Sequence, residues 1–508
     1  MIHWLTIHSV HNISVGTIMN RIFTDYKREI YIFCLSYLSC LIMYGQELAN
    51  FSLSIDEELS DNFLKTIAFS RWGHAYLKEY LLPEPYTPFF TTLMSILFLS
   101  LTVVVISRII KAKGLTCFIL PISFIGFPQY AYQIEFSNQS DTMSIGLLLS
   151  SLSVLFFQKA TNGRLWVNLI AGVLLSTASL SIYQSAIIFT LSLFLMQMCC
   201  VLFNGNHAER RFYNVLNFGA GITLSVLIYF SLSALIREHY QVDNSGYLLN
   251  QVGWLVNGSS SMIPMIESIT NYFTFKSYYG LNIYFLTLPL YLLCMLKIFL
   301  GNLSNRKELA LWLTLFMLSP FALTVLFGSD LAPRTMLALP VTFAGMIVIA
   351  FLLMNRALPF AALSVVSLLI SSNAASQLSY SDHMAREQDS KIANRMISII
   401  YEKYPSFDES KTPVYFYGAY QPDNFWRKNN SDVFGSSYFA WDGGSNKRLF
   451  YFFKTTNTAN FVRPDVACVK KMQERAAEIN PWPSPESIEM VDGCLIIKLG
   501  STPSPYIF

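Results

Sequence analysis

Four carboxylates fall within six positions of a chain that is otherwise poor in charge: Asp56, Glu57, Glu58 and Asp61. Arg71 and His74 follow in the same polar stretch. A carboxylate can take a proton from an attacking hydroxyl group, and nearby cations can stabilise a phosphate leaving group. These residue types at this spacing fit group transfer from a phosphate-bearing substrate, and they equally fit a solvated loop.

Three further polar clusters stand at the ends of apolar runs: Glu135 and Asp141 around FSNQSDT, Tyr183 and Gln184 in SIYQSA, and Asp330 with Arg334 in GSDLAPRTM. Charged side chains so close to a hydrocarbon phase are costly and often mark functional sites. Each cluster also has a plainer interpretation. The acids and the tyrosine fit a membrane interface, and Arg334 fits an ion pair with Asp330.

The composition identifies the solvent that these clusters border. The 508 residues are 53% hydrophobic and 13% charged, with a mean hydropathy of +0.41, whereas soluble domains carry roughly 25% charged residues. The chain is therefore expected to be a polytopic membrane protein. A net charge of +3 with no long basic run argues against nucleic acid as a partner. The mixed, polar first 29 residues argue against a cleavable signal peptide.

Apolar runs long enough to cross a bilayer predict about eleven transmembrane helices. They are expected at residues 30–48, 88–107, 114–130, 142–158, 165–183, 185–203, 215–236, 281–298, 309–327, 335–354 and 357–374. With the N-terminus in the cytoplasm, the inner segments carry fourteen lysines and arginines and the outer loops before the tail carry six. Since basic residues favour the cytoplasm, all four polar clusters and the tail are expected outside.

Two regions are expected, a transmembrane region at 1–375 with outer loops at 49–87 and 237–280, and a C-terminal domain at 376–508. The tail pattern predicts helices at 386–404 and 465–479 and strands at 412–420 and 494–500, which indicates a small α/β domain. Cys468 and Cys494 stand in this polar tail and are either a disulfide or two buried thiols. No CxxC or HExxH spacing occurs, so no cofactor is expected. The outer acids could bind a divalent metal, but no ligand pattern indicates one.

The layout resembles the O-antigen glucosyltransferases of phage-encoded serotype conversion in enteric bacteria, the Gtr type-specific family of the GT-C class. SIDEE after the first span carries this resemblance together with RWGHAYLKEYL, SNQSDT, SIYQS and LAPRT. The resemblance implies a GT-C-like fold in the bacterial inner membrane, with a cytoplasmic N-terminus and a periplasmic active site. It also implies undecaprenyl-phosphate-glucose as donor and O-antigen polysaccharide of lipopolysaccharide as acceptor. The partners implied are a lipid-glucose flippase and a polyprenyl-phosphate glucosyltransferase.

By GT-C analogy the acid after the first span is the general base, which assigns Asp56 first and Glu57 second. The family typically has paired acids and this chain has three in a row, so the choice among Asp56, Glu57 and Glu58 stays open. Position assigns Arg71, Arg334 and His74 to the donor phosphate, and Glu135, Asp141, Tyr183 and Gln184 to substrate. The competing functions are a GT-C transferase of another sugar, an O-antigen polymerase and a flippase.

Overall fold

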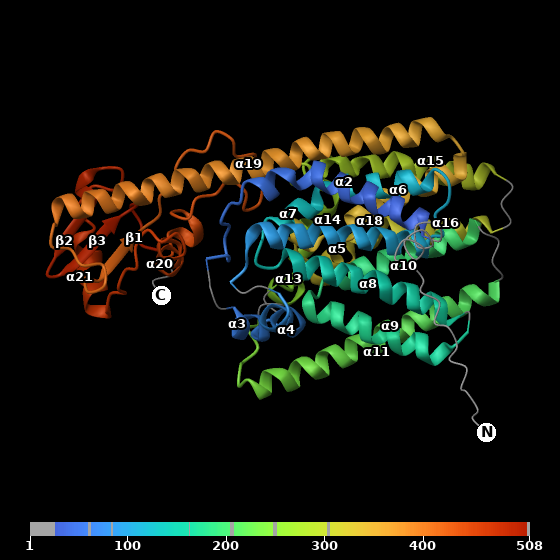
Figure 1. The fold of residues 1–508 in the computed structure, drawn as a ribbon, viewed down its shortest axis with the longest axis horizontal. Helices are drawn as coiled ribbons and strands as arrows, with labels where there is room; N and C mark the ends of the chain where they lie inside the picture. The colour runs from blue at the N-terminus through green and yellow to red at the C-terminus, as the bar shows by residue number, and fades with distance from the viewer. Residues whose placement is uncertain are drawn as a thin grey trace, which may run out of the picture.

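The structure is a computed structural model, and it describes residues 26–58, 62–82, 85–161, 163–203, 208–246, 251–301 and 305–504. These residues form a bundle of long helices with a small sheet at one end (Figure 1). The long helices are α2 (Lys27–Ala49), α5 (Pro88–Ile109), α8 (Ser140–Ala160), α9 (Leu165–Ile182), α10 (Ala186–Phe203), α11 (Ala208–His239), α15 (Thr287–Leu300), α16 (Arg306–Leu318), α18 (Leu339–Met354) and α19 (Ala357–Lys403).

The expected membrane spans appear as helices. Among the described residues, eight helical segments are long and apolar enough to cross a membrane, and two shorter apolar helices, Ala186–Leu202 and Leu339–Met354, accompany them. Two of the eight include bends. The 3-10 helix η3 (Leu281–Leu286) leads into α15, and η4 (Ser319–Phe321) joins α16 to α17 (Ala322–Phe327). The fold class of a polytopic helical membrane protein with a small C-terminal sheet is confirmed.

The candidate span at 114–130 is not one helix. It divides into α6 (Thr116–Ile125) and the 3-10 helix η1 (Pro128–Tyr130), which α7 (Ala131–Ile134) continues. Phe127 is extended before Pro128, as the proline ring requires of the preceding residue. A Cβ atom on Gly126 would lie 3.0 Å from the Leu368 Cα of α19. The break therefore lets α19 pack close to the end of α6.

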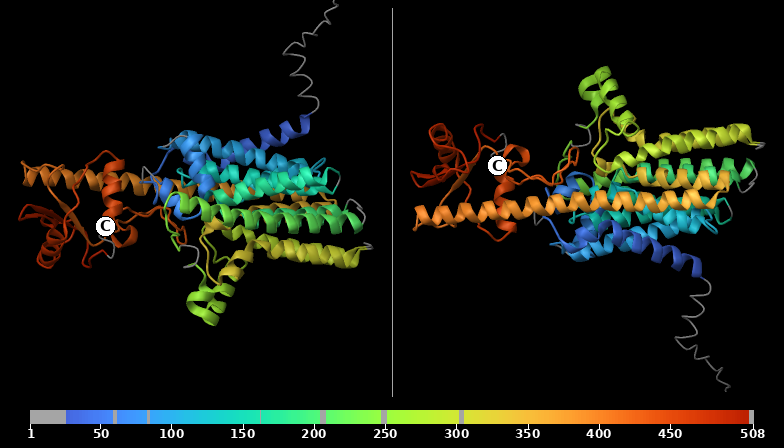
Figure 2. Two further views of the ribbon diagram at one scale, coloured as in Figure 1. Left: turned by 90° about the horizontal axis from the view of Figure 1, so that it is seen from below. Right: turned by 90° about the horizontal axis from the view of Figure 1, so that it is seen from above.

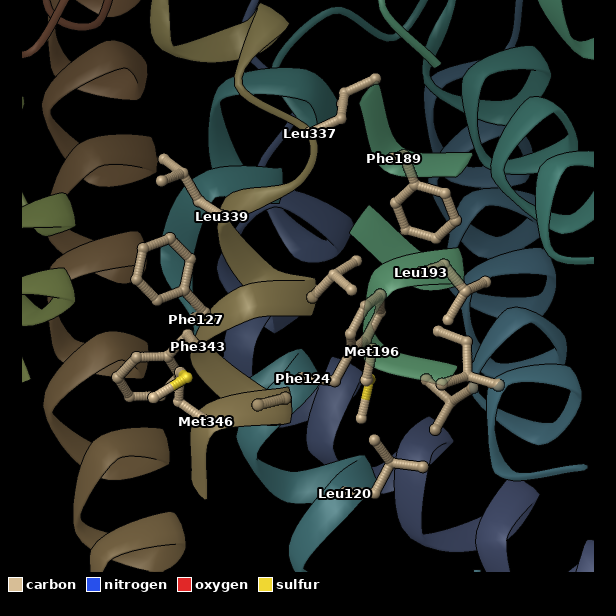
Figure 3. Packing of buried hydrophobic residues seen from close by; sticks show 14 of the residues in the cluster. Leu120, Phe124, Phe127, Phe189, Leu193, Met196, Leu337, Leu339, Phe343 and Met346 are labelled. Carbon is tan, nitrogen blue, oxygen red and sulfur yellow. The ribbon is translucent and has the colours of Figure 1, made fainter. Parts of the chain in front are cut away.

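The centre of the bundle is an aromatic and aliphatic core. Figure 3 shows side chains of α6, α10 and α18 packing together, among them Phe124, Phe189 and Phe343. The Phe127 and Phe343 rings lie 5.1 Å apart, and both residues are fully buried. This core gives the short helices α6, α10 and α18 their fixed positions.

Helix α19 joins the bundle to the C-terminal sheet. Its 47 residues run along the bundle and continue beyond it (Figures 1 and 2). At 1.5 Å per residue it is about 70 Å long, more than twice the thickness of a hydrocarbon core. The span expected at 357–374 and the helix expected at 386–404 are thus one helix, and residue 375 lies inside it.

The C-terminal region is a three-stranded sheet with helices on both faces. The strands β1 (Val414–Tyr417), β2 (Ile488–Val491) and β3 (Cys494–Lys498) lie in the order β1-β3-β2, with β1 parallel and β2 antiparallel to β3. Alternate residues of a strand face opposite sides. Phe416 and Ile497 accordingly pack with α19 and α20 (Asn446–Thr455), whereas Tyr415 and Ile496 pack with α21 (Val466–Arg475).

Cys468 of α21 and Cys494 of β3 form a disulfide, with their Cα atoms 6.2 Å apart. This bond fastens α21 to the central strand of the sheet. Of the two alternatives for these cysteines, the structure has the disulfide.

Candidate active site

Residues 54–58 follow α2 and contain three adjacent acids in three different environments. Asp56 has φ +70°, a left-handed conformation that Asp adopts more readily than most residues. Its side chain is 46% exposed, whereas Glu57 and Glu58 are each 2% exposed. Asp61 lies outside the described residues. The turn at Asp56 therefore leaves one of the three acids accessible.

Two cations surround the Asp56 carboxylate. Its Oδ1 lies 3.4 Å from Lys65 Nζ and 3.3 Å from Arg448 Nη2. Burial raises the pKa of Asp56, but the charges of Lys65 and Arg448 outweigh this effect and hold the pKa below its usual value. Asp56 is therefore ionised at neutral pH and can accept a proton.

Glu57 and Glu58 differ from Asp56 in the direction of their pKa shifts as well as in exposure. Glu57 accepts hydrogen bonds from the backbone N–H groups of Ser54, at 2.7 Å, and Asn138, at 3.3 Å. Burial raises the pKa of Glu57 well above its usual value. Burial also raises the pKa of Glu58, although Arg448 lies 2.7 Å from its Oε1 and acts in the opposite direction. A general base must reach the hydroxyl that it deprotonates, and of the three acids only Asp56 is accessible, which favours Asp56.

A pocket of about 550 Å³ opens beside Asp56. It is bordered by the short helices α3 (Phe63–Ala68) and α4 (Trp72–Tyr80), which lie at the same end of the bundle as the C-terminal sheet (Figure 1). Six of the nine residues proposed from sequence line it, although they come from four separate parts of the chain: Asp56, Arg71, His74, Tyr183, Gln184 and Arg334. The fold therefore brings most of the proposed site together.

Arg71 is held by the Tyr183–Gln184 turn. Its guanidinium carbon lies 4.6 Å from the centre of the Tyr183 ring, and its Nε donates to Gln184 Oε1 at 3.4 Å. Gln184 Nε2 in turn donates to the Phe69 carbonyl at 2.7 Å. A cation placed over an aromatic ring and bonded to an amide is fixed in direction. Tyr183 and Gln184 thus position a cation in the pocket.

Arg334 lies in the 3-10 helix η5 (Pro333–Thr335) on the same pocket. Its Nη1 is 3.3 Å from Asp432 Oδ2, and 27% of its side chain is exposed. Asp330 accepts a hydrogen bond from Ser268 at 2.6 Å. Arg334 is thus paired with an acid of the C-terminal region and still faces the pocket.

His74 is a neutral group in this site. Burial lowers its pKa to about 3, and the nearby charges of Lys78 and Arg71 act in the same direction. Its Nδ1 lies 2.8 Å from Thr142 Oγ1. A neutral imidazole offers a hydrogen bond to substrate but no positive charge, so the cationic role expected for His74 passes to its neighbours.

The other three proposed residues, Glu57, Glu135 and Asp141, are not among the described residues that line the pocket. Asp141 is buried and lies 2.9 Å from Lys78 Nζ, and Lys78 does line the pocket. Glu135 is also buried and accepts from Ser54 Oγ at 3.0 Å. Asp141 therefore contacts a residue that lines the pocket, and Glu135 contacts the segment that carries Asp56.

Comparison with known families decides the class of the protein. Residues 45–355 match the family described as Glucosyl transferase GtrII. The chain belongs to this GtrII glucosyl transferase family. It is therefore a glycosyltransferase, and the match covers every residue proposed for the site from sequence. No curated protein and no solved structure matches the chain.

The GtrII pocket contains cations that the sequence did not single out. Its described lining has five lysines and arginines against two carboxylates. Lys65 and Lys78 belong to the same segment between α2 and α5 as Arg71, and this closeness in sequence could have drawn attention to them. Arg448 has no such signal, because it lies 392 positions from Asp56 and outside the matched residues. The lining alone carries more basic than acidic groups, which favours an anionic substrate. Lys78, Arg334 and Arg448 also pair with acids behind the lining.

Among the described residues of this GtrII family member, metal binding has no obvious location. Among the residues that the structure describes, no three His, Cys, Asp or Glu side chains are grouped as ligands for a metal ion. The charged groups that face the pocket are instead mostly basic side chains, which can themselves neutralise a phosphate.

Proposed function

We propose that this GtrII family member transfers glucose from undecaprenyl-phosphate-glucose to the O-antigen of lipopolysaccharide, on the periplasmic face of the bacterial inner membrane. The observation that carries the proposal is the pocket in which one ionised, accessible carboxylate, Asp56, lies among five cations. This arrangement fits removal of a proton from a sugar hydroxyl and departure of a phosphate.

The transfer takes place in one displacement. The oxygen of an acceptor hydroxyl forms a bond to C1 of glucose while the bond from C1 to the phosphate oxygen breaks. Asp56 takes the hydroxyl proton, and undecaprenyl phosphate leaves with the electron pair of the broken bond. Attack opposite the leaving group inverts the configuration at C1. Arg71 and Arg334 stabilise the charge that develops on the phosphate.

The remaining polar residues support these groups. Tyr183 and Gln184 orient Arg71 and border the sugar, and the His74 imidazole offers a neutral hydrogen bond. Asp141 fixes the Lys78 ammonium group at the pocket. Glu135, bonded to Ser54, fixes the segment that carries Asp56.

The apolar wall of the pocket supports a lipid-borne donor. Leu323, Phe327 and Leu331 line it, from α17 and the loop that follows. On the same short helix Val325 and Leu326 are exposed, at 49% and 66%. One helix thus separates the pocket from an apolar outer surface, so a phosphate can bind inside while its prenyl chain follows the apolar side.

The sidedness rests on charge and on the disulfide. The exposed cations Arg28 and Arg108 pair with Glu29. These residues lie at the start of α2 and the end of α5, and Figure 1 shows these helix ends on the side of the bundle away from the C-terminal sheet. Basic residues favour the cytoplasm, and disulfides persist in oxidising compartments such as the periplasm. Nucleotide sugars are absent there, so a flippase must deliver the lipid-linked glucose that a polyprenyl-phosphate glucosyltransferase makes.

The test is glucose transfer from labelled undecaprenyl-phosphate-glucose to O-antigen in membranes with matched protein levels. D56N keeps the shape of the side chain and removes its basic oxygen, so transfer should fall by a factor of about 10²–10⁴. D243N is the matched control, because Asp243 is an exposed acid of another outer loop and is not among the described residues that line the pocket. Full activity in D56N would contradict the assignment of the base.

A further inference from the structure

Arg448 reaches the pocket from the C-terminal domain. It lies on α20, its side chain is 18% exposed, and it lines the pocket together with Asp56. Its guanidinium bridges three carboxylates. Nη2 is 3.3 Å from Asp56, Nη1 is 2.7 Å from Glu58, and Nε pairs with Asp442. One side chain of the tail thus contacts the proposed base and also its neighbour.

The same domain holds the backbone on both sides of Asp56. The Tyr438 hydroxyl donates to the Ser54 carbonyl oxygen. Thr455, on α20 with Arg448, donates from Oγ1 to the Glu58 carbonyl oxygen at 2.8 Å. Two bonds of the C-terminal domain therefore fix the turn, and Arg448 fixes the side chain that the turn presents.

We propose that Arg448 is a positioning residue for Asp56, so that the C-terminal domain completes the active site of the helical region. The proposal rests on the proposed function, because Asp56 is the base only in that reaction. Arginine suits this place since its planar fork donates to several carboxylate oxygens at once, whereas a lysine presents a single point charge. Arg448 lies beyond residues 45–355, so the site includes a part that the family match does not cover.

The role has a consequence for the pH dependence of transfer. The charged groups around Asp56 are Lys65 from α3, Arg448 from α20, and the acids Glu58 and Asp442, both paired with Arg448. Burial raises the pKa of Asp56 while Lys65 and Arg448 lower it. Without Arg448 only Lys65 opposes burial, so the pKa of Asp56 rises. A general base acts only when it is deprotonated. The acid limb of the pH profile, where the transfer rate falls as the pH decreases, must therefore move to higher pH.

The experiment compares full-length wild type, R448Q, R448K, D56N and the double variant D56N/R448Q across a pH series, with labelled undecaprenyl-phosphate-glucose in membranes. R448Q should lose transfer roughly 10- to 100-fold, because a misplacement of about 1 Å costs about that much, and its acid limb should move up. R448K keeps the positive charge, so its transfer rate should fall at the same acidic pH as in wild type, although the rate itself should be lower. K471Q is the control, since Lys471 forms an exposed ion pair with Asp492 in the same domain.

The double variant separates positioning from any independent role. If Arg448 acts through Asp56, R448Q lowers the residual activity of D56N by less than about twofold, because coupled residues are not additive. The proposal would be overturned if the loss of transfer in D56N/R448Q equalled the product of the losses in the two single variants. It would also be overturned if the acid limb of R448Q stayed at the wild-type pH. If R448Q does not accumulate in the membrane, R448K becomes the test of the proposal. R448K retains the positive charge, so a fall in its transfer rate that begins at a higher pH than in wild type would overturn the proposal. Failure of the proposed function itself is distinct, because wild type and K471Q would then also transfer no glucose from this donor.

Discussion

At the end of the bundle that carries the C-terminal sheet, Lys78 and Asp141 pair at 2.9 Å with 6% and 0% of their side chains exposed. At the opposite end Arg108 and Glu29 pair at 3.3 Å with 42% and 16% exposed. Burying a charged pair is costly and needs close compensation, whereas an exposed pair costs and contributes little. Of these two pairs, the one whose charges are costly to bury is therefore the pair beside the pocket.

The largest effect on stability is expected where the buried pair is broken. K78M leaves the Asp141 carboxylate buried without its partner, and breaking such a pair costs about 3–5 kcal/mol. The measurement is the fraction of folded protein after a temperature series in detergent. K78M/D141N removes both charges and should recover part of the loss, and a K78M protein as stable as wild type would contradict a compensated buried pair.

A smaller effect distinguishes two neighbours at the pocket end. E57Q replaces a buried acid that is not among the described residues lining the pocket, so glucose transfer should fall by less than about tenfold if Asp56 is the base. Some loss is expected because Glu57 accepts from Ser54 and Asn138, and an amide nitrogen cannot accept. Transfer rates of E57Q and D56N in membranes with equal protein levels check this. An equally large loss of glucose transfer in E57Q and D56N would contradict the assignment of Asp56 rather than Glu57 as the base.

The smallest effect is expected at the opposite end. R108Q removes an exposed partner of Glu29, and exposed pairs contribute about 0–1 kcal/mol. Transfer and thermal stability should match wild type within error in the same assays. A loss of stability in R108Q comparable to that in K78M would contradict the expectation that the exposed Arg108–Glu29 pair contributes less than the buried Lys78–Asp141 pair.

The sequence predicted much of the fold because apolar runs of bilayer length have few alternatives. It missed the break at Gly126–Pro128, since the run stays apolar through it; Pro128 holds Phe127 extended, and Leu368 of α19 approaches Gly126 closely. It also divided α19, because the composition becomes polar near residue 375 while the helix continues.

The candidate site was predictable where the clusters border the ends of spans, as with Asp56, Arg71, Tyr183 and Arg334. Local pattern could not rank Asp56 above Glu57, since only the positive φ of Asp56 and the burial of Glu57 distinguish them. Nor could it find Arg448, whose contact with the pocket depends on how the C-terminal domain docks.

The central claim is that glucose is transferred in this pocket, from the outer face of the membrane. T66C places a thiol of nearly the same size on the pocket lining, since Thr66 is one of its residues. Spheroplasts that carry T66C would be treated with a charged, membrane-impermeant thiol reagent before glucose transfer is measured, with wild type treated in parallel. We expect T66C to lose transfer after outside labelling, with protection by undecaprenyl-phosphate-glucose, while wild type keeps it. Loss of transfer only when the reagent reaches the cytoplasmic side would contradict the account.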